Sequence, residues 1–393
     1  MKIPLVSSFL EDDVYETRLT DKFMEEVICN EDHFYHRIAK SLSMKNFEPI
    51  VYYMSQEKNE KTFLHKYGHS IIRIPAKKIN FIHEPIIYSS QLINNIKKNY
   101  EVCNFVSGYY VMYKIPDMFD YTVFKLNKKM PIIARWAGGN HNWLMPLRKS
   151  IKKAALQRCD KILVSSSEEI KILQNIFDIK KENISNIVNP INLELFQKRE
   201  RKFSAKKISL DPDFRYLLYV GRLTKNKGLE LLLESFNEIN SKFEDLKLII
   251  IGEGPLSNII KNFIINNNLE EKIIVTGRLS HEETCYYYNI ATVLVNTGFS
   301  AGLPNIIIES LASGTPIITT DVGASKEYVN EKYSNGILIK PSDKNELKNA
   351  IKIILDNENK FRNYDTNFLK KFSYQKFGDK LASIYSEVLK NKQ

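Results

Sequence analysis

Short apolar runs alternate with amphipathic stretches through the C-terminal half of the chain. Stretches of helical length and spacing begin at Leu229 and Leu256, between two pairs of these runs. Continuous apolar strands that alternate with helices predict a parallel sheet covered by helices on both faces. The strands predicted in this half lie at 216–220, 247–251, 273–276, 292–296, 316–320 and 336–339.

The N-terminal half is less regular but similar in kind, so the sequence predicts two α/β domains in tandem. We expect an N-terminal domain over 1–195, a C-terminal domain over 196–370, and a terminal helix over 371–393 that packs back toward the first domain. The connection at 190–213 has few apolar residues and mixed charge, as interdomain connections do. The strands predicted in this half lie at 2–10, 48–54, 70–75, 100–106, 130–138 and 160–166, and the helices at 34–45 and 145–158.

Composition narrows the class of protein. A chain of 393 residues with 43% apolar residues can bury two or three cores. The four cysteines form no CxxC or Cys/His cluster, and the N-terminus has three consecutive acids, unlike a signal peptide. An uncharged stretch from Thr284 to Ile308 contains too many polar and glycine residues for a membrane span. We therefore expect a cytoplasmic protein.

Positive charge is concentrated in one segment of the N-terminal half. The net charge is +11, and residues 125–161 carry ten basic side chains and one acid. Arg148, Lys149, Lys152 and Lys153 lie on the predicted helix 145–158 and form a candidate patch for a phosphorylated acceptor or an anionic membrane. A solvated helix face explains the same pattern equally well. No recognition motif accompanies the segment, so nucleic acid is not an expected partner.

The segment GRLTKNKG, residues 221–228, has the form of an anion site. A strand runs into Gly221, and Gly228 opens a helix whose N-terminal amides and dipole favour negative charge. Arg222 and Lys227 add two cations, which suit a diphosphate. An ordinary strand–turn–helix junction is the alternative.

A second loop, SAGLP, leads into a predicted helix from about Asn305 to Ser313. Glu309 lies one turn inside this helix, in an apolar, uncharged stretch. A carboxylate buried there requires hydrogen-bond donors, which the hydroxyls of a ribose would supply. The alternative is a helix-terminal glutamate exposed to water.

These blocks together resemble the retaining, nucleotide-sugar-dependent glycosyltransferases of family 4, which have the GT-B fold. The resemblance rests on YVGRLTKNKGLELLLESF, LIIIGEGPL, VTGRLSHEE, LPNIIIESLASGTPIITTDVGASKEYV and NPINLELF, and it is strong over about 160–393. It implies two doubly wound Rossmann-like domains that face each other across a cleft.

The resemblance also implies roles for individual residues. Arg222 and Lys227 would hold the donor diphosphate together with the loop residues Gly302, Leu303 and Asn305. Glu309 would bind the ribose hydroxyls, and Arg278 would lie near the base. The donor is a nucleoside-diphosphate sugar, and no metal or other cofactor is implied, because cations and helix N-termini neutralise the leaving diphosphate.

The sequence departs from the family pattern at three places. Ala301 stands where a second glutamate contacts the transferred sugar, Val106 lies near the expected position of an N-domain histidine, and the early glycine-rich turn is replaced by a long acidic segment. His141, in the segment ARWAGGNHNW, is the remaining candidate for a catalytic polar group near the sugar. The other histidines show no mutual metal-ligand spacing in the sequence, so a metal site is not expected.

The leading interpretation is an enzyme that transfers a sugar to a glycan or lipid-linked acceptor with retention of anomeric configuration. It would work in the cytoplasm or on the inner face of the membrane. A GT-B-type sugar-nucleotide epimerase is one alternative. A weakened paralogue that binds donor or glycan as a partner subunit is another.

Overall fold

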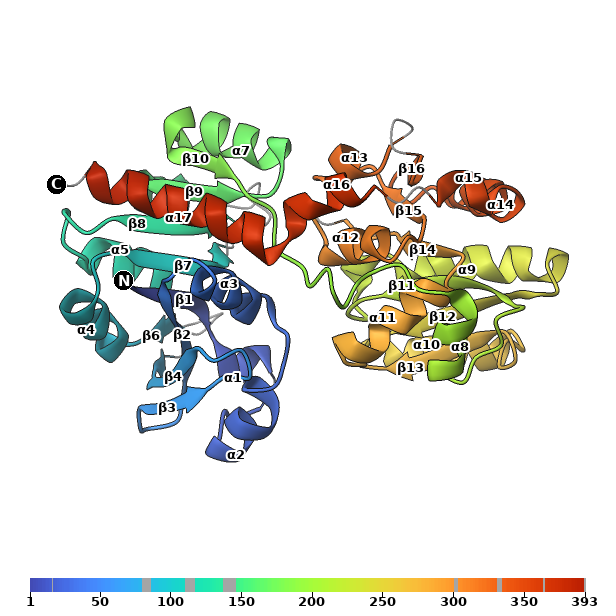
Figure 1. Ribbon diagram of the computed structural model, residues 1–393, viewed down its shortest axis with the longest axis horizontal. Helices are drawn as coiled ribbons and strands as arrows, with labels where there is room; N and C mark the ends of the chain where they lie inside the picture. Colours follow the sequence, from blue (N-terminus) through green and yellow to red (C-terminus); the bar gives the residue numbers. More distant parts are fainter. Residues whose placement is uncertain are drawn as a thin grey trace. The chain divides into compact units, whose positions relative to one another are not determined.

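The chain forms two compact α/β units in a computed structural model that describes residues 1–15, 17–79, 86–109, 117–136, 146–299, 303–330, 334–362 and 365–391. Unit 1 comprises Met1–Pro190 together with Ser373–Gln393, and unit 2 comprises Ile191–Phe372. The last helix, coloured red in Figure 1, therefore belongs to the same unit as the blue N-terminal strand.

Unit 1 is built on an eight-stranded sheet with the order β10-β9-β8-β7-β1-β2-β4-β3. Its pairings are parallel except for the antiparallel β3–β4 pair. Chain order reverses between β1 and β7, which makes the sheet doubly wound. The strands are β1 (Lys2–Leu10), β2 (Glu48–Ser55), β3 (Lys61–Leu64), β4 (Ser70–Pro75), β7 (Cys103–Tyr109), β8 (Ile132–Trp136), β9 (Lys161–Val164) and β10 (Ile184–Asn186), with a separate antiparallel pair, β5 (Lys77–Ile79) and β6 (Ile86–Tyr88).

Helices cover this sheet, and the last of them closes one face. The helix α17 packs along α3, and its Tyr385 hydroxyl accepts a hydrogen bond of 2.6 Å from the buried Asn104 amide on β7. The segment between β1 and α3 folds into short helical turns rather than one open loop. The helices of unit 1 are α1 (Glu11–Val14), α2 (Asp21–Phe23), a π-helical turn (Met24–Ile28), α3 (Phe34–Ser43), α4 (Ser90–Asn99), α5 (Met118–Lys125), α6 (Pro146–Gln157), α7 (Ser167–Phe177), a 3-10 turn (Lys181–Asn183) and α17 (Tyr374–Lys390).

Unit 2 has a six-stranded, wholly parallel sheet with the order β13-β12-β11-β14-β15-β16. Numbered along the unit this order is 3-2-1-4-5-6, the Rossmann order, which reverses between β11 and β14. Ligands of such sheets bind outside the carboxyl ends of the strands at this reversal. The strands are β11 (Arg215–Val220), β12 (Leu246–Ile251), β13 (Ile273–Gly277), β14 (Val293–Asn296), β15 (Ile317–Thr320) and β16 (Gly336–Ile339).

Helices pack on both faces of this second sheet. Leu232, Phe236 and Ile351 are among the buried side chains that join the α9 and α14 helices to the strands. The helices of unit 2 are α8 (Arg201–Lys207), a 3-10 turn (Lys225–Lys227), α9 (Leu229–Ile239), a 3-10 turn (Asn240–Lys242), α10 (Ser257–Asn266), α11 (His281–Ile290), α12 (Asn305–Ala312), α13 (Ser325–Tyr328), α14 (Lys344–Asp356), α15 (Glu358–Phe361), α16 (Thr366–Leu369) and a 3-10 turn (Lys370–Phe372).

The predicted α/β class with doubly wound parallel sheets is confirmed. All six strands expected in the second half are present within a residue of their predicted ends. The strands that periodicity missed are short, and β5 has three exposed residues, so no run of apolar positions marks it. Among the described helices, none has the length and apolar content to cross a bilayer.

Candidate functional site

The loops after β11 and β14 are joined by hydrogen bonds at the reversal point of unit 2. The Thr297 hydroxyl donates to the Gly228 carbonyl at 2.8 Å, and the Phe299 amide donates to the Asn226 carbonyl at 3.2 Å. The two segments that the sequence singled out, GRLTKNKG and the loop before α12, therefore meet at the carboxyl edge of the sheet.

Gly228 makes this contact possible. Its φ is +66°, and a Cβ atom built there would lie 2.3 Å from the Thr297 carbonyl oxygen. Any larger residue would push the two loops apart and would also strain the backbone. On the other side of the contact, a Cβ atom at Gly298 would lie 3.6 Å from Lys227 Cδ, so the Lys227 side chain runs close past this second glycine.

The two predicted cations lie on the same loop with different exposure. Arg222 is exposed, whereas Lys227 is half-buried. Burial lowers the pKa of Lys227, because removal from water disfavours the ammonium form. An anion bound beside Lys227 would favour the ammonium form, which suits the expected contact with a diphosphate.

A second set of loops packs against the first at the same edge. The Leu223 amide donates to the Glu253 carbonyl at 2.9 Å, and a Cβ atom at Gly252 would lie 1.9 Å from the Gly221 carbonyl oxygen. Arg278, the residue expected near the base, follows β13, and its amide donates to the Glu253 carboxylate at 3.3 Å. The Arg278 side chain is exposed.

The helix α12 begins at Asn305, as expected, and holds Glu309 inside the unit. Glu309 is 3% exposed, which excludes the alternative of a glutamate open to water. The buried Tyr288 hydroxyl on α11 donates to Glu309 Oε2 at 3.0 Å. Tyr288 was not predicted, because it stands in a run of three tyrosines whose orientation only the helix fixes. Leu303, the other expected loop residue described here, is 8% exposed.

Three residues of the predicted site lie outside the described residues: His141, Ala301 and Gly302. Arg148 lies on α6, but its side chain is also outside the description. The structure therefore describes the expected diphosphate and ribose contacts more fully than the expected sugar contacts.

The basic segment 125–161 exposes fewer unpaired positive charges than its sequence indicates. Lys152 is fully buried, and its ammonium contacts the carboxylates of Asp117 and Asp120 on the α5 side. Burial and the neighbouring Asp117 charge raise the pKa of Asp120. The assignment of Lys152 to a surface patch was wrong.

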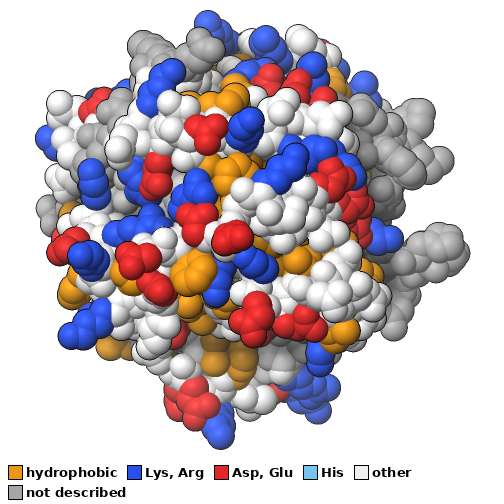
Figure 2. Space-filling model, turned by 90° about the vertical axis from the view of Figure 1, so that its right-hand side faces the viewer, with side chains coloured by type: hydrophobic (Ala, Val, Ile, Leu, Met, Phe, Trp, Pro, Cys, Tyr) orange, Lys and Arg blue, Asp and Glu red, His pale blue; other side chains and the backbone are white. Residues whose placement is uncertain are grey.

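Other cations of the segment are also paired with acids from elsewhere in unit 1. Lys153 contacts Asp178, and the Lys161 ammonium lies 2.6 Å from the Glu387 carboxylate. Lys149 is exposed. Acids that are distant in sequence thus offset much of the local positive charge. Figure 2 draws a different face of the molecule, on which basic and acidic side chains are interspersed.

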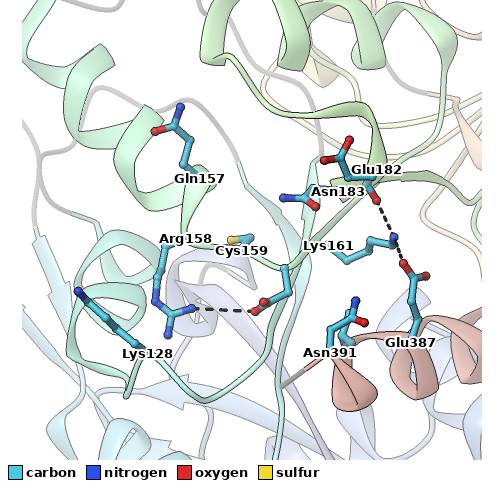
Figure 3. Close-up of a pocket in the computed structure, with 11 residues that line it drawn as sticks. Lys128, Gln157, Arg158, Cys159, Lys161, Glu182, Asn183, Glu387 and Asn391 are labelled. Carbon is cyan, nitrogen blue, oxygen red and sulfur yellow. Dashed lines mark hydrogen bonds and ion pairs between the residues drawn. The ribbon is translucent and has the colours of Figure 1, made fainter. Parts of the chain in front are cut away.

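A cavity of about 460 Å³ in unit 1 lies at the amino end of β9 (Figure 3). Lys161 spans it from β9 and bonds both the Glu182 carbonyl at 2.7 Å and the Glu387 carboxylate. The Arg158 guanidinium lies 4.0 Å from Asp160. This cavity lies at the amino end of a strand rather than at a carboxyl end, and no predicted site residue lines it.

The histidines differ from expectation as well. The expectation of no mutual metal-ligand arrangement was wrong, because the fold brings His36, His65 and His69 together. The ligand nitrogens of these three lie within 4.8 Å of one another. His36 is 29 residues before His65 in the sequence, so a test of local spacing does not group the two.

Comparison with known proteins supports the fold and the class of the C-terminal unit. The sequence model of the family described as glycosyl transferases group 1 matches residues 200–371, nearly all of unit 2. A glycosyltransferase of Methanocaldococcus jannaschii is 30% identical over 254 residues. That match covers 62% of this chain and 65% of the relative, so the chain spans less than two thirds of the relative's length.

Two solved structures share the architecture of the whole chain. Sucrose-phosphate synthase from Thermosynechococcus elongatus has a TM-score of 0.75 over 100% of both chains at 18% identity. HepE from Anabaena, in complex with UDP, has a TM-score of 0.71 over 98% of this chain and 100% of its own, at 13% identity. These likenesses confirm the expected GT-B fold with two Rossmann-like domains. Similarity to glycosyltransferases is likewise established for unit 2.

Lys152→Met should reduce the free energy of unfolding by about 3–5 kcal/mol, because it leaves the buried Asp120 carboxylate and the half-buried Asp117 carboxylate without their cation. Urea-induced unfolding monitored by fluorescence measures this change. Lys149→Met, on the exposed part of the same helix, should change it by less than about 0.5 kcal/mol. Equal, small effects of both substitutions would show that the buried cluster does not stabilise unit 1.

Proposed function

We propose that the chain is a retaining glycosyltransferase that moves a sugar from a nucleoside diphosphate to a glycan or lipid-linked acceptor. The observation that carries this proposal is the contact between the Gly228 and Thr297 loops. It joins the turn that carries Lys227, at the reversal point of a Rossmann sheet, to the segment after β14 that precedes α12 and its buried Glu309 in the sequence. The match of unit 2 to group 1 glycosyl transferases supports the same class.

The donor would bind through its diphosphate and its ribose. Arg222 and Lys227 would hold the phosphate oxygens, with backbone amides of Gly302, Leu303 and Asn305 at the N-terminus of α12. Glu309 would accept from ribose hydroxyls while its Oε2 atom keeps the bond from Tyr288. Arg278 would lie near the base. HepE is a structural neighbour in complex with UDP, which makes UDP-sugars the first donors to test.

The reaction would break the bond between the anomeric carbon and the donor phosphate oxygen. The acceptor oxygen would attack from the face that the diphosphate leaves, so the anomeric carbon would keep its configuration. The proton of the acceptor hydroxyl would pass to a phosphate oxygen of the leaving diphosphate. Arg222, Lys227 and the α12 N-terminus would stabilise the charge that develops on the diphosphate without a metal ion. His141 is proposed as the polar group of unit 1 that contacts the sugar or acceptor.

Arg222→Ala and Lys227→Ala should each weaken donor binding about 10- to 150-fold, which corresponds to about 1.5–3 kcal/mol for a hydrogen bond to a charged group. Calorimetric titration with UDP-, GDP- and ADP-sugars identifies the donor and measures the loss. Lys225→Ala removes an exposed lysine from the same turn and should bind donor like the wild type. Wild-type affinity in both test variants would refute the diphosphate assignment.

Glu309→Gln should weaken donor binding about tenfold or more, because a neutral amide is a poorer acceptor for ribose hydroxyls than a carboxylate. The wild type should bind a 2′,3′-dideoxy donor analogue more weakly than the ribose form, and the variant should discriminate less between the two. The assignment fails if both proteins lose the same factor on removal of the hydroxyls.

We also propose reversible attachment to an anionic membrane surface through the exposed lysines of the segment 125–161. Lys125, Lys128, Lys129 and Lys149 are exposed. Each would contribute about 1 kcal/mol near an anionic surface at modest salt. Co-sedimentation with phosphatidylglycerol vesicles should fall on raising salt and on replacing these four lysines by serine. If neither higher salt nor the four substitutions reduced vesicle binding, the lysines would be ordinary solvated side chains and the proposal would be refuted.

A further inference from the structure

Three histidines of unit 1 are collected at one buried position. His36 lies on α3, and His65 and His69 close the turn between β3 and β4, where the His65 amide donates to the His69 carbonyl at 3.0 Å. Their side chains are 0%, 2% and 4% exposed, respectively. The rings of His36 and His65 are stacked, with centroids 3.9 Å apart and planes inclined by 16°.

The partners of His65 fix its tautomer. The Tyr67 amide donates to His65 Nδ1 at 3.1 Å, so Nδ1 carries a lone pair. His65 Nε2 therefore carries the proton and donates it to the Glu31 carbonyl at 2.9 Å.

A chain of hydrogen bonds fixes the other two tautomers. The Tyr15 hydroxyl donates to the Glu31 carboxylate, and the Tyr53 hydroxyl bonds to Tyr15, which must accept because its own proton is used. His36 Nε2, 3.0 Å from the Tyr53 hydroxyl, must then donate. His36 Nδ1 accepts in turn from His69 Nε2 at 2.9 Å.

This ordering leaves an unprotonated Nδ1 on each of the three rings. Those of His36 and His65 accept hydrogen bonds. His69 Nδ1 is buried and has no hydrogen-bond partner among the described residues. A buried nitrogen lone pair without a donor is unfavourable unless something binds it.

We propose that His36, His65 and His69 form a binding site for a divalent transition-metal ion, represented by Zn²⁺. Imidazole nitrogens suit zinc, and three histidines with an open fourth position are an established zinc ligand set. The chain that runs from His36 through the tyrosines to Glu31 matches the outer partners that orient metal-bound histidines. Burial also keeps the rings neutral, since it lowers the pKa of His65 to about 4 and that of His69 to about 3.

Binding requires a small local rearrangement. Ligand nitrogens around tetrahedral zinc lie about 3.4 Å apart at Zn–N distances of about 2.0–2.1 Å, so nitrogens separated by up to 4.8 Å must move inward. The stacked rings must also turn about their Cβ–Cγ bonds, which exchanges the His36–His69 and Tyr67–His65 hydrogen bonds for metal–nitrogen bonds. A cavity of about 570 Å³, lined in part by Cys29, His65 and Gly68, lies beside the site.

The bound ion would join the β3–β4 turn to α3 and thereby stabilise unit 1. This role is independent of the proposed sugar transfer, for which no metal is invoked.

The test is zinc binding to the full chain after treatment with a chelator. Calorimetry and elemental analysis should give one Zn²⁺ per chain. At a free concentration one hundred times the Kd, zinc should shift the folded-to-unfolded ratio about 100-fold and raise the Tm. His69→Gln and His65→Gln should lose this binding, and His281→Gln, a histidine of unit 2, should retain it. A wild-type chain without zinc binding, or unchanged binding in both test variants, would overturn the proposal.

A second measurement uses the wild type alone, so it does not depend on whether the variants fold. Co²⁺ added to the metal-free chain should give the intense visible bands of a four-coordinate, nitrogen-rich site, and Zn²⁺ should displace it. The weak spectrum of six-coordinate Co²⁺ with oxygen ligands would mean adventitious binding and would refute the site.

Discussion

The close approach of Gly228 and Thr297 is the constraint on which the proposed donor site depends. The strands β11 and β14 are parallel neighbours in the sheet, although their paired positions Leu217 and Val293 are 76 residues apart in the sequence. Their following loops could diverge, as the loops at a reversal point often do. A missing side chain at residue 228 and one threonine hydroxyl hold them together instead. The position of Lys227 beside Gly298 follows from that contact, in which the Lys227 carbonyl also accepts from the Thr297 hydroxyl at 3.2 Å.

Much of unit 2 could be predicted from the sequence because its signals are local. Most of its strands are continuous apolar runs, and several of them lead directly into turns that contain glycine. Glu309 was recognisable because an acid in an uncharged apolar stretch is expensive to bury, and the structure does bury it. Its partner Tyr288 was not recognisable, since a hydroxyl that satisfies a carboxylate from another helix leaves no pattern in its own segment.

Unit 1 resisted prediction where the chemistry depends on residues that are distant in sequence. Counting charges along 125–161 gave a basic patch, but Asp117, Asp178 and Glu387 approach from other segments and neutralise part of it. For the histidines the error was the reverse, since a cluster was missed rather than wrongly predicted. Their spacing along the chain gave no sign of the cluster that forms where α3 lies against the β3–β4 turn. Burial and pairing are properties of the fold, and composition alone does not report them.

The return of α17 to unit 1 sets the order in which the two units can be completed during synthesis. Tyr385 and Asn104, which bond to each other in the core, are 281 residues apart, and all of unit 2 lies between them. As the ribosome releases the chain, unit 2 is finished at Phe372, whereas unit 1 still lacks its last helix. The surface of unit 1 that α17 covers therefore stays open to solvent or chaperones until α17 has emerged from the ribosome. A chain built this way completes its second domain before its first.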